Sequence, residues 1–342
     1  MNPQWQEFLT ARGAQMAADD SVRFPGPGAP SDCTLFDLSH LGLIAVRGED
    51  TESFLQGQLT NDIRELSATH TQLSSHCSPK GRMLASFRVL RLGDAVYLQL
   101  PRERLPDALK RLRLYVLRAK VALEDASDTL IRIAIAGDCA EEALARLGLA
   151  VPVRDEDLET TDGVSVLRLP SPSPRFELIG PIDALMGLWD ALSQVAAPSS
   201  PDAWGLLDIR GGIPTVYRET VEAFVPQMVN LQLIDGVSFN KGCYTGQEVV
   251  ARMQYLGKLK RRMYWAEVEA DSPPRPGDAL HAPTSTSEQA SGRVVDARPA
   301  GPGRFELLAV VEIDAAEGGE VRLGEQGPLL RLRPPPYGFP QG

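Results

Sequence analysis

The first half of the chain carries apolar runs of two different periods. Leu41 to Val46 is a continuous apolar run that ends at Gly48, which is the pattern of a buried strand. Phe54, Leu55 and Leu59 then recur at helical spacing. The pattern therefore predicts a strand followed by a helix that buries these three side chains.

A β-hairpin is predicted next. Apolar residues alternate from Met83 to Leu92 and from Ala95 to Leu100, and Gly93-Asp94 between them has the chemistry of a two-residue hairpin turn. Further along, Leu130 to Ala136 is typical of a strand and Ala140 to Leu147 of a helix. Helices and strands mix here without strict βαβ order, which favours an α+β class.

Leucines at three- and four-residue spacing predict a helix from Leu105 to Arg118. Its other face carries Lys110, Arg111, Arg113 and Arg118. A charged outer face on an amphipathic helix is normally solvated, and contact with an anion or with RNA is the alternative.

The pattern changes after the proline-rich break from Ser272 to Pro276. Short β-type runs follow, at Gly292 to Val295, Phe305 to Val311 and Glu320 to Leu323, without helical periodicity. We therefore expect a small C-terminal barrel or sandwich that begins near Lys260.

The length of the chain indicates how many domains to expect, and its charge limits the classes of function. A chain of 342 residues exceeds what one hydrophobic core usually serves, so two or three domains are expected. The formal net charge of −10 argues against broad nucleic-acid binding, because a phosphate backbone requires a basic protein surface. No apolar run approaches the length that crosses a bilayer, and residues 1–16 lack the pattern of a signal peptide. We expect a soluble cytoplasmic protein with no membrane partner.

The cysteines lie far apart in the sequence. Cys33, Cys77, Cys139 and Cys243 form no C-x-x-C pair and have no histidine cluster nearby. This spacing argues against a disulfide framework and against a metal site, so we expect reduced thiols and no bound metal.

The segment with the most chemical information is Lys241-Gly-Cys-Tyr-Thr-Gly-Gln-Glu248. Thr245 and Glu248 have the spacing of a capping box, which predicts a helix start and a helix that buries Val249, Val250, Met253 and Leu256. Cys243 would then precede a helix N-terminus and follow a lysine, a setting that favours the thiolate. A cysteine that packs inertly beneath the helix is the alternative from local pattern alone.

This motif, with the Phe224-Val-Pro-Gln-Met-Val-Asn-Leu231 segment before it and Arg252 after it, closely resembles the signature of the YgfZ family. That family shares its fold with the glycine-cleavage T protein, a tetrahydrofolate-dependent aminomethyltransferase. The resemblance covers roughly residues 33 to 338. Further matching segments are Gln56-Gly-Gln-Leu-Thr-Asn-Asp62, His76-Cys-Ser-Pro-Lys-Gly-Arg82 and Pro334-Pro-Pro-Tyr337.

The resemblance implies an α+β, T-protein-like arrangement of three domains around a central opening that holds a folate. We assign residues 1–30 to an N-terminal arm, 31–258 to a folate-binding region of two interleaved α+β subdomains, and 259–338 to a C-terminal β-barrel.

The resemblance also implies a role. The family supports the assembly or repair of iron–sulfur clusters and, through client enzymes, tRNA modification. Its partners would be folate and iron–sulfur client or assembly proteins, and its cofactor tetrahydrofolate or a related folate. The functional thiol falls on Cys243. The matched motif residues around it are Lys241, Gly242, Tyr244, Thr245, Gly246, Gln247, Glu248 and Arg252.

Two positions match the tryptophans that contact folate in the family. Trp204 occupies the first, and an indole can stack on a pterin. Leu41 occupies the second, where an aliphatic side chain packs but cannot stack. A core role at a domain seam is the alternative for Trp204.

Two other functions remain as alternatives. A T-protein-like aminomethyltransferase would need carboxylates where this chain has Ala85 and Ser86, so an accessory protein is favoured over an enzyme. Direct tRNA binding is the second alternative, and a solvated face is favoured over it. The tRNA-binding alternative rests on the basic residues Arg252, Lys258, Lys260, Arg261 and Arg262.

Overall fold

A computed structural model describes residues 1–17, 21–24, 32–283 and 290–339. The rest of the expected N-terminal arm, residues 18–20 and 25–30, lies outside the described residues. The chain divides into two compact units, each built from several segments. The first unit comprises residues 1–51, 66–72 and 88–204, and the second comprises 52–65, 73–87 and 205–342.

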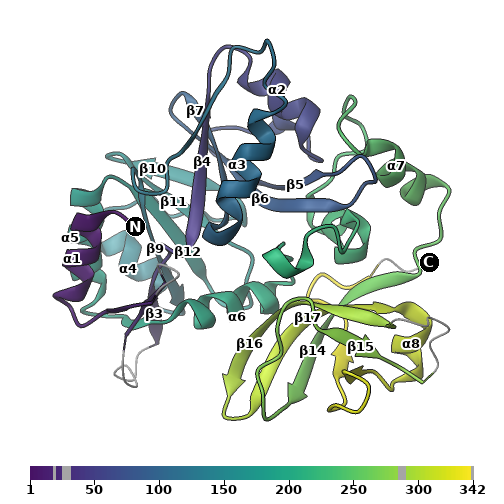
Figure 1. Cartoon of the computed structure of the whole chain (residues 1–342). Coiled ribbons are helices and arrows are strands. Elements are labelled where there is room, and N and C mark those ends of the chain that lie inside the picture. The colour runs from purple at the N-terminus through teal and green to yellow at the C-terminus, as the bar shows by residue number, and fades with distance from the viewer. Residues whose placement is uncertain (18–20, 25–31, 284–289, 340–342) are drawn as a thin grey trace. The chain divides into compact units, whose positions relative to one another are not determined.

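A six-stranded sheet forms the centre of the first unit (Figure 1). All its neighbouring strands are antiparallel except β13 and β3, which are parallel. In sheet order, the strands are β10 (Leu158–Thr161), β11 (Val164–Arg168), β12 (Arg175–Gly180), β9 (Ile131–Gly137), β3 (Cys33–Asp37) and β13 (Ala197–Ser199).

One face of this sheet packs against helices. Ile131, Ile133 and Ile135 alternate along β9 into a core that also holds the fully buried Trp5 and Trp189. These tryptophans come from α1 (Pro3–Thr10) and α5 (Ile182–Leu192), which lie side by side in Figure 1. The N-terminal segment is therefore part of the core. Helix α4 (Ala140–Arg146) adds Ala143 and Leu144 to it, and β1 (Gln15–Met16) pairs with β2 (Val22–Arg23).

The predicted strand–helix and hairpin elements are confirmed. Strand β4 (Leu41–Arg47) pairs with β7 (Ala95–Pro101) and β8 (Ala122–Asp125). Strand β6 (Met83–Leu92) meets β7 in a hairpin in which Leu92 pairs with Ala95. Helix α3 (Leu105–Arg113) packs against β4 and β8.

The C-terminal part of the second unit is a curled, half-barrel sheet of six strands (Figure 1). In sheet order its strands are β18 (Arg322–Leu323), β15 (Ala279–His281), β16 (Gly292–Gly301), β17 (Arg304–Glu312), β14 (Arg261–Glu269) and β19 (Arg331–Arg333). The β-rich character is as predicted. A short helix, α8 (Ile313–Gly318), was not predicted, because six residues are too few to show helical periodicity.

The rest of the second unit shares an apolar core with the C-terminal sheet. Cys77, Met83, Phe224, Leu231 and Val250 meet there. The helices and strands that contribute to it include β5 (Gln72–Cys77), β6, α6 (Pro201–Gly211), α7 (Gln247–Tyr255), and β14, β16 and β17 of the C-terminal sheet. Helix α2 (Thr51–Gln58) precedes β5 in the chain and buries Phe54 and Leu55. Five short 3-10 helices complete the described secondary structure: η1 (Ile63–Glu65), η2 (Arg102–Arg104), η3 (Arg218–Thr220), η4 (Pro226–Val229) and η5 (Leu231–Ile234).

Two expectations are wrong. Helix α3 ends at Arg113 and not at Arg118, because Leu117 has a left-handed backbone with φ of 44° that no α-helix accommodates. Cys33 and Cys139 form a disulfide and are not reduced. The two cysteines lie far apart in sequence, but the pairing of Cys33 with Gly137 on β9 brings them together.

Candidate functional site

Cys243 is an exposed, free thiol in a loop whose neighbouring side chains are buried. Gly242 beside it is also exposed, whereas Lys241 and Tyr244 on either side of the pair are buried. The loop therefore presents the thiol outward and is held from both ends. The prediction of an accessible Cys243 is consistent with this geometry, and the inert buried alternative is not.

Lys241 fixes the start of the loop. Its ammonium nitrogen donates to the carbonyl oxygens of Leu59 at 2.6 Å and Asn61 at 2.7 Å. The same nitrogen lies 5.1 Å from the centre of the Tyr244 ring. Burial lowers the pKa of Lys241 to about 8. The lysine thus joins the motif around Cys243 to the 56–62 segment.

The 56–62 segment is itself tied to the chain that leads into the loop. The Asn61 side-chain amide donates to the carbonyls of Leu73 at 3.0 Å and Asp235 at 2.5 Å. The Thr60 hydroxyl donates to the Gly236 carbonyl at 2.8 Å. Polar side chains therefore build a hydrogen-bonded base beneath the cysteine loop.

Gly246 brings the third matched segment to the same place. It is the N-cap of α7 with φ of 83°, a conformation that glycine adopts without strain. A β-carbon at this position would lie 2.4 Å from the Ser78 carbonyl oxygen and 3.1 Å from the Gly81 α-carbon. The 76–82 turn thus approaches the loop as closely as backbones allow. Three segments that are distant in the sequence meet in one unit.

The predicted capping box is wrong. Gly246 is the N-cap, and no side chain caps the helix, because the left-handed glycine moves the helix start one residue beyond Thr245. Of the four side chains expected in the core only Val250 is buried, and Leu256 is 85% exposed because the helix ends at Tyr255.

The second free cysteine, Cys77, has the opposite environment. It is fully buried, its sulfur lies 3.7 Å from the Ser75 hydroxyl, and burial raises the pKa of the thiol to about 12. Cys77 is therefore a packed thiol that stays protonated.

The first unit contains a second chemically distinctive feature. On the face of its six-stranded sheet opposite the isoleucine core, Arg132 of β9 and Arg175 and Glu177 of β12 lie on one side. The small side chains of Ala134 and Ala136 lie on the same side of the sheet, because Glu177 pairs with Ala134 and Arg175 pairs with Ala136. Small residues among buried charges leave this face polar.

Some hydrogen-bonding capacity on this face is unused. The Gln99 amide donates to Glu177 at 2.9 Å, and the Arg132 Nη2 atom donates to the Leu41 carbonyl at 2.5 Å. Within the described residues, Gln99 Oε1 and the Nε and Nη1 atoms of Arg132 have no hydrogen-bond partner, although all are buried. Burial lowers the pKa of the Arg132 guanidinium, and Glu177 opposes that shift. Buried donors and acceptors without a protein partner call for an explanation, and a bound polar ligand or water is one.

Trp204 lies on the same face. Its ring is 5.3 Å from that of Phe36, and the Arg175 guanidinium lies 4.6 Å from its centre. Trp204 is buried, and Leu41 is half-buried at the start of β4. Both predicted folate residues therefore belong to the first unit. The Leu41 carbonyl accepts a hydrogen bond from Arg132, and the Trp204 ring lies against the Arg175 guanidinium.

Sequence reasoning missed Arg132, Arg175, Glu177 and Gln99. A signal was available, because charged residues interrupt the apolar strands Ile131–Gly137 and Arg175–Gly180. Arginine and glutamate are rarely buried without a specific role or partner.

The basic residues after the motif have different environments. Arg261 forms an ion pair with Glu312 at 2.9 Å, Arg262 lies over the Phe339 ring, and Arg252 is exposed. In the part of the chain that the structure describes, no group of three or more His, Cys, Asp or Glu residues could hold a metal ion. None of the described helices combines the length and the apolar character needed to cross a membrane.

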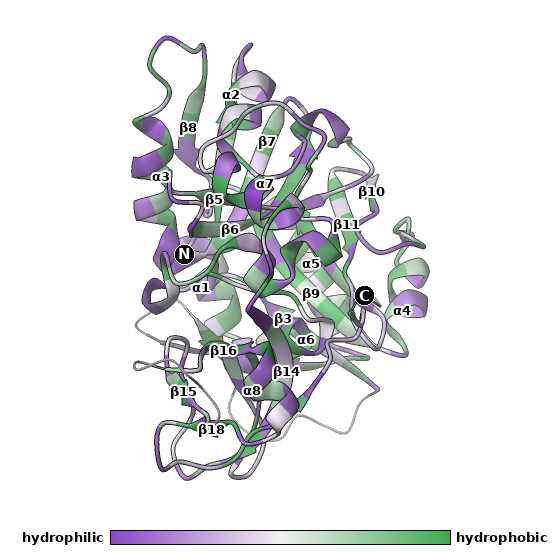
Figure 2. Cartoon of the chain, turned by 90° about the vertical axis from the view of Figure 1, so that its right-hand side faces the viewer, coloured by the Kyte–Doolittle hydropathy of each residue, from purple (hydrophilic) through white to green (hydrophobic). Residues whose placement is uncertain are grey.

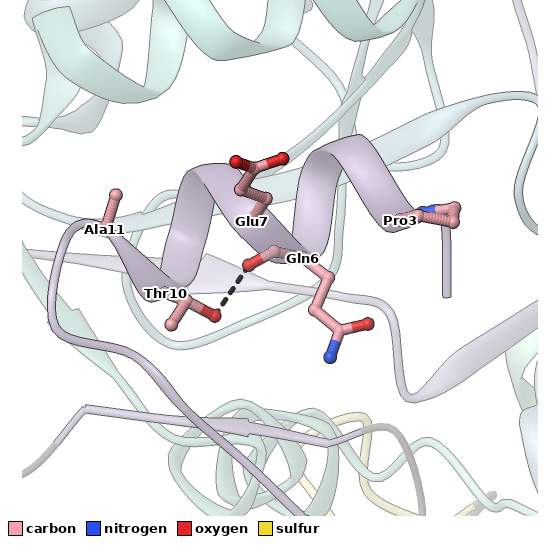
Figure 3. Close-up of a pocket in the computed structure, with 5 residues that line it drawn as sticks. All are labelled: Pro3, Gln6, Glu7, Thr10 and Ala11. Carbon is pink, nitrogen blue, oxygen red and sulfur yellow. Dashed lines mark hydrogen bonds between the residues drawn. The ribbon is translucent and has the colours of Figure 1, made fainter.

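A shallow pocket also runs along the outer side of α1 (Figure 3). Its lining contains one charged side chain, and Thr10 donates to the Gln6 carbonyl at 2.8 Å. The lining residues are Pro3, Gln6, Glu7, Thr10 and Ala11. None belongs to a predicted site.

Comparisons with known proteins agree with this architecture. Residues 29–164 match the family model of the GCVT N-terminal domain. The structure is similar to the glycine cleavage system aminomethyltransferase T from Bartonella henselae, with a TM-score of 0.78, 18% identity and 98% of each chain covered. At this identity the likeness shows the fold, which is the mixed α+β fold of the T protein over the whole chain.

Sequence relatives carry the assignment further. The tRNA-modifying protein YgfZ of Klebsiella pneumoniae (strain 342) is 33% identical over 316 residues, which cover 92% of this chain and 96% of that protein. The protein of the same name from Yersinia pestis (strain Pestoides F) is 32% identical over 305 residues, covering 89% and 92%. The chain therefore belongs to the YgfZ family of tRNA-modifying proteins.

Proposed function

We propose that this protein is a folate-binding accessory factor that supports the assembly or repair of iron–sulfur proteins and, through client enzymes, tRNA modification. The observation that carries the proposal is the exposed Cys243 in a loop anchored by Lys241. The names of the YgfZ relatives support the connection to tRNA modification.

A single exposed thiol limits the chemistry that the loop can perform. Cys243 can exchange with a disulfide or persulfide, or can donate one bond to an iron atom of a client's cluster. It cannot hold a cluster alone, so the remaining ligands would come from the client. A fixed loop favours such a transient contact, because little conformational entropy is lost when the partner binds.

The folate would bind at the polar sheet face of the first unit. A pterin ring presents donors and acceptors along its edge, and the Glu177 carboxylate and Arg132 guanidinium offer the complementary groups. Trp204 and Leu41 would contribute the apolar contacts. These side chains would bind and orient the pterin, which supplies one-carbon chemistry when it carries a one-carbon unit.

A T-protein-like aminomethyltransferase remains the second candidate, motivated by the shared fold. Ala85 and Ser86 oppose it, because Ala85 is buried and the Ser86 hydroxyl accepts a hydrogen bond from the Val216 amide at 2.9 Å. Neither side chain can transfer a proton as a carboxylate would. Formation of methylene-tetrahydrofolate from an aminomethyl donor by the purified protein would favour this candidate.

Complementation of a strain that lacks the protein tests the role of the thiol. We expect the wild type and Cys77→Ala to restore the activity of iron–sulfur enzymes, and Cys243→Ala to fail. Equal expression of the variants is checked by immunoblotting. Full rescue by Cys243→Ala would refute the proposed role of this thiol.

Titration with tetrahydrofolate, followed by tryptophan fluorescence, tests the folate site separately. We expect Glu177→Gln to weaken binding about tenfold or more, because it removes a charged acceptor, which is worth about 1.5–3 kcal/mol. Trp204→Phe should remove most of the quenching. Glu159→Gln, a change at an exposed carboxylate of the same unit, is the matched control and should bind normally. Unchanged affinity of Glu177→Gln would exclude this face.

A further inference from the structure

The turn that follows α3 exposes two leucines. Leu114 is 67% exposed and Leu117 is 88% exposed, whereas Tyr115 and Val116 between them are half-buried. We call residues 110–120 the α3 tip. Four consecutive apolar residues at a protein surface are unusual unless they contact something.

The α3 tip is held in shape by its own hydrogen bonds. The Tyr115 amide donates to the Leu112 carbonyl at 3.0 Å, and the Ala119 amide donates to the Val116 carbonyl at 2.7 Å. Leu117 adopts φ of 44°, a left-handed conformation that is costly for a leucine. The surrounding structure therefore maintains an unfavourable backbone that projects an apolar side chain into solvent.

The far end of the tip is fixed to another loop. The Lys120 amide donates to the Asp50 carboxylate at 2.8 Å. A β-carbon at Gly48 would lie 2.0 Å from the Lys120 carbonyl oxygen, so only glycine permits this approach. Both ends are thus anchored, and the exposed leucines are pre-organised for contact.

Positive charge surrounds the leucines. Lys110 and Arg118 are exposed, and Arg113 is held in place by donating to the Leu123 carbonyl at 2.6 and 3.1 Å. Figure 2 shows the hydrophilic character of the outer side of α3. Favourable interaction with the helix dipole explains cations in the last turn of α3, but Arg118 lies beyond the helix. The chain as a whole has a formal net charge of −10, so a basic surface is unusual for this protein.

We propose that the α3 tip is a docking surface for a protein partner that offers an apolar pocket with an acidic rim. Leu114 and Leu117 would enter the pocket, and Lys110 and Arg118 would face the acidic rim. RNA fits less well, because leucine gains nothing from phosphates and cannot stack on bases as aromatic residues do. A membrane fits less well, because two leucines give little apolar area for stable insertion. This proposal is independent of the folate and thiol roles.

Site-specific crosslinking in the full-length protein tests the surface. The photoreactive residue p-benzoylphenylalanine is placed at position 117 and, as a control, at Val153, which is an exposed apolar position of the same unit. We expect irradiation of cells to capture one protein through position 117 and not through position 153. Capture at both positions, or at neither, would overturn the proposal.

Binding between the purified proteins then tests the chemistry. We expect Leu117→Glu to weaken the complex about tenfold or more, while Val153→Glu leaves it unchanged, and we expect affinity to fall with added salt. Circular dichroism checks that both variants fold. Two further arms use bulk transfer RNA and vesicles of phosphatidylethanolamine and phosphatidylglycerol. Binding of either at physiological salt that Leu117→Glu abolishes, or a captured protein that binds Leu117→Glu normally, would refute a protein partner.

Discussion

Gly246 and Ser78 approach each other so closely that a β-carbon on residue 246 would lie 2.4 Å from the Ser78 carbonyl oxygen. The contact joins the 76–82 turn to the start of α7, and it depends on the φ of 83° at Gly246. We expect Gly246→Ala to destabilise the protein by about 2 kcal/mol, because alanine adds both backbone strain and a steric clash. Urea unfolding measures the change.

Gly242→Ala is the matched control for that substitution. A β-carbon at Gly242 would meet no atom within 4 Å, and its φ is not positive. We therefore expect little change in the free energy of unfolding. Equal destabilisation by the two substitutions would contradict the close approach at Gly246.

The buried Lys241 makes stability depend on pH in a defined direction. Its pKa is about 8 in the folded protein against 10.5 for an unperturbed lysine. Between these values the unfolded chain binds more protons than the folded one, so the free energy of unfolding rises with pH. Below pH 8 both states are protonated and this contribution is constant.

Urea unfolding at several pH values measures that dependence. We expect the wild type to gain about 1–2 kcal/mol relative to Lys241→Gln between pH 7.5 and 9.5. The neutral amine retains two hydrogens, so the bonds to Leu59 and Asn61 persist after deprotonation. A stability difference that does not vary with pH would show that Lys241 titrates normally.

Alkylation distinguishes the four cysteines by their environments. Iodoacetamide at pH 8 should modify one thiol of the native protein, Cys243, because Cys77 is buried with its pKa raised to about 12. Denaturant should expose Cys77 as a second site, and reduction should release Cys33 and Cys139. Mass spectrometry of the peptides identifies each site. Modification of Cys77 in the native state at the rate of Cys243 would contradict its burial.

The disulfide between Cys33 and Cys139 spans 106 residues of sequence. Restricting the unfolded chain in this way stabilises a protein by about 2–4 kcal/mol. We expect the double variant Cys33→Ser/Cys139→Ser to be destabilised by that amount under oxidising conditions. In the presence of dithiothreitol the wild type and the variant should converge, and a difference that persists would assign the effect to packing.

Much of the fold was predictable because its elements have strong local patterns. The β6–β7 hairpin follows from Gly93 between two alternating runs, and β4 follows from its continuous apolar stretch. The end of α3 was not predictable, because the left-handed conformation of Leu117 depends on anchoring at Lys120 and not on any local signal. Likewise, the strand pairing that brings Cys33 to Cys139 is a long-range contact.

The candidate site was predictable where a motif carried it. The resemblance located Cys243 and Lys241, but the carbonyls that hold the lysine come from a segment about 180 residues earlier. Glu177 and Arg132 were missed although charged residues interrupt both strands, because only the register of β9 and β12 shows that the two side chains lie on one face.

The two units are interleaved along the chain, with crossings at 51/52, 65/66, 72/73, 87/88 and 204/205. During synthesis, every residue of the first unit has been translated by position 204, whereas segments 52–65 and 73–87 must wait for their partners, which are translated last. Cys77 and Met83 therefore remain without the apolar core that they share with Phe224, Leu231 and Val250 until translation is nearly finished. The nascent chain therefore has an interval in which these segments need protection from aggregation.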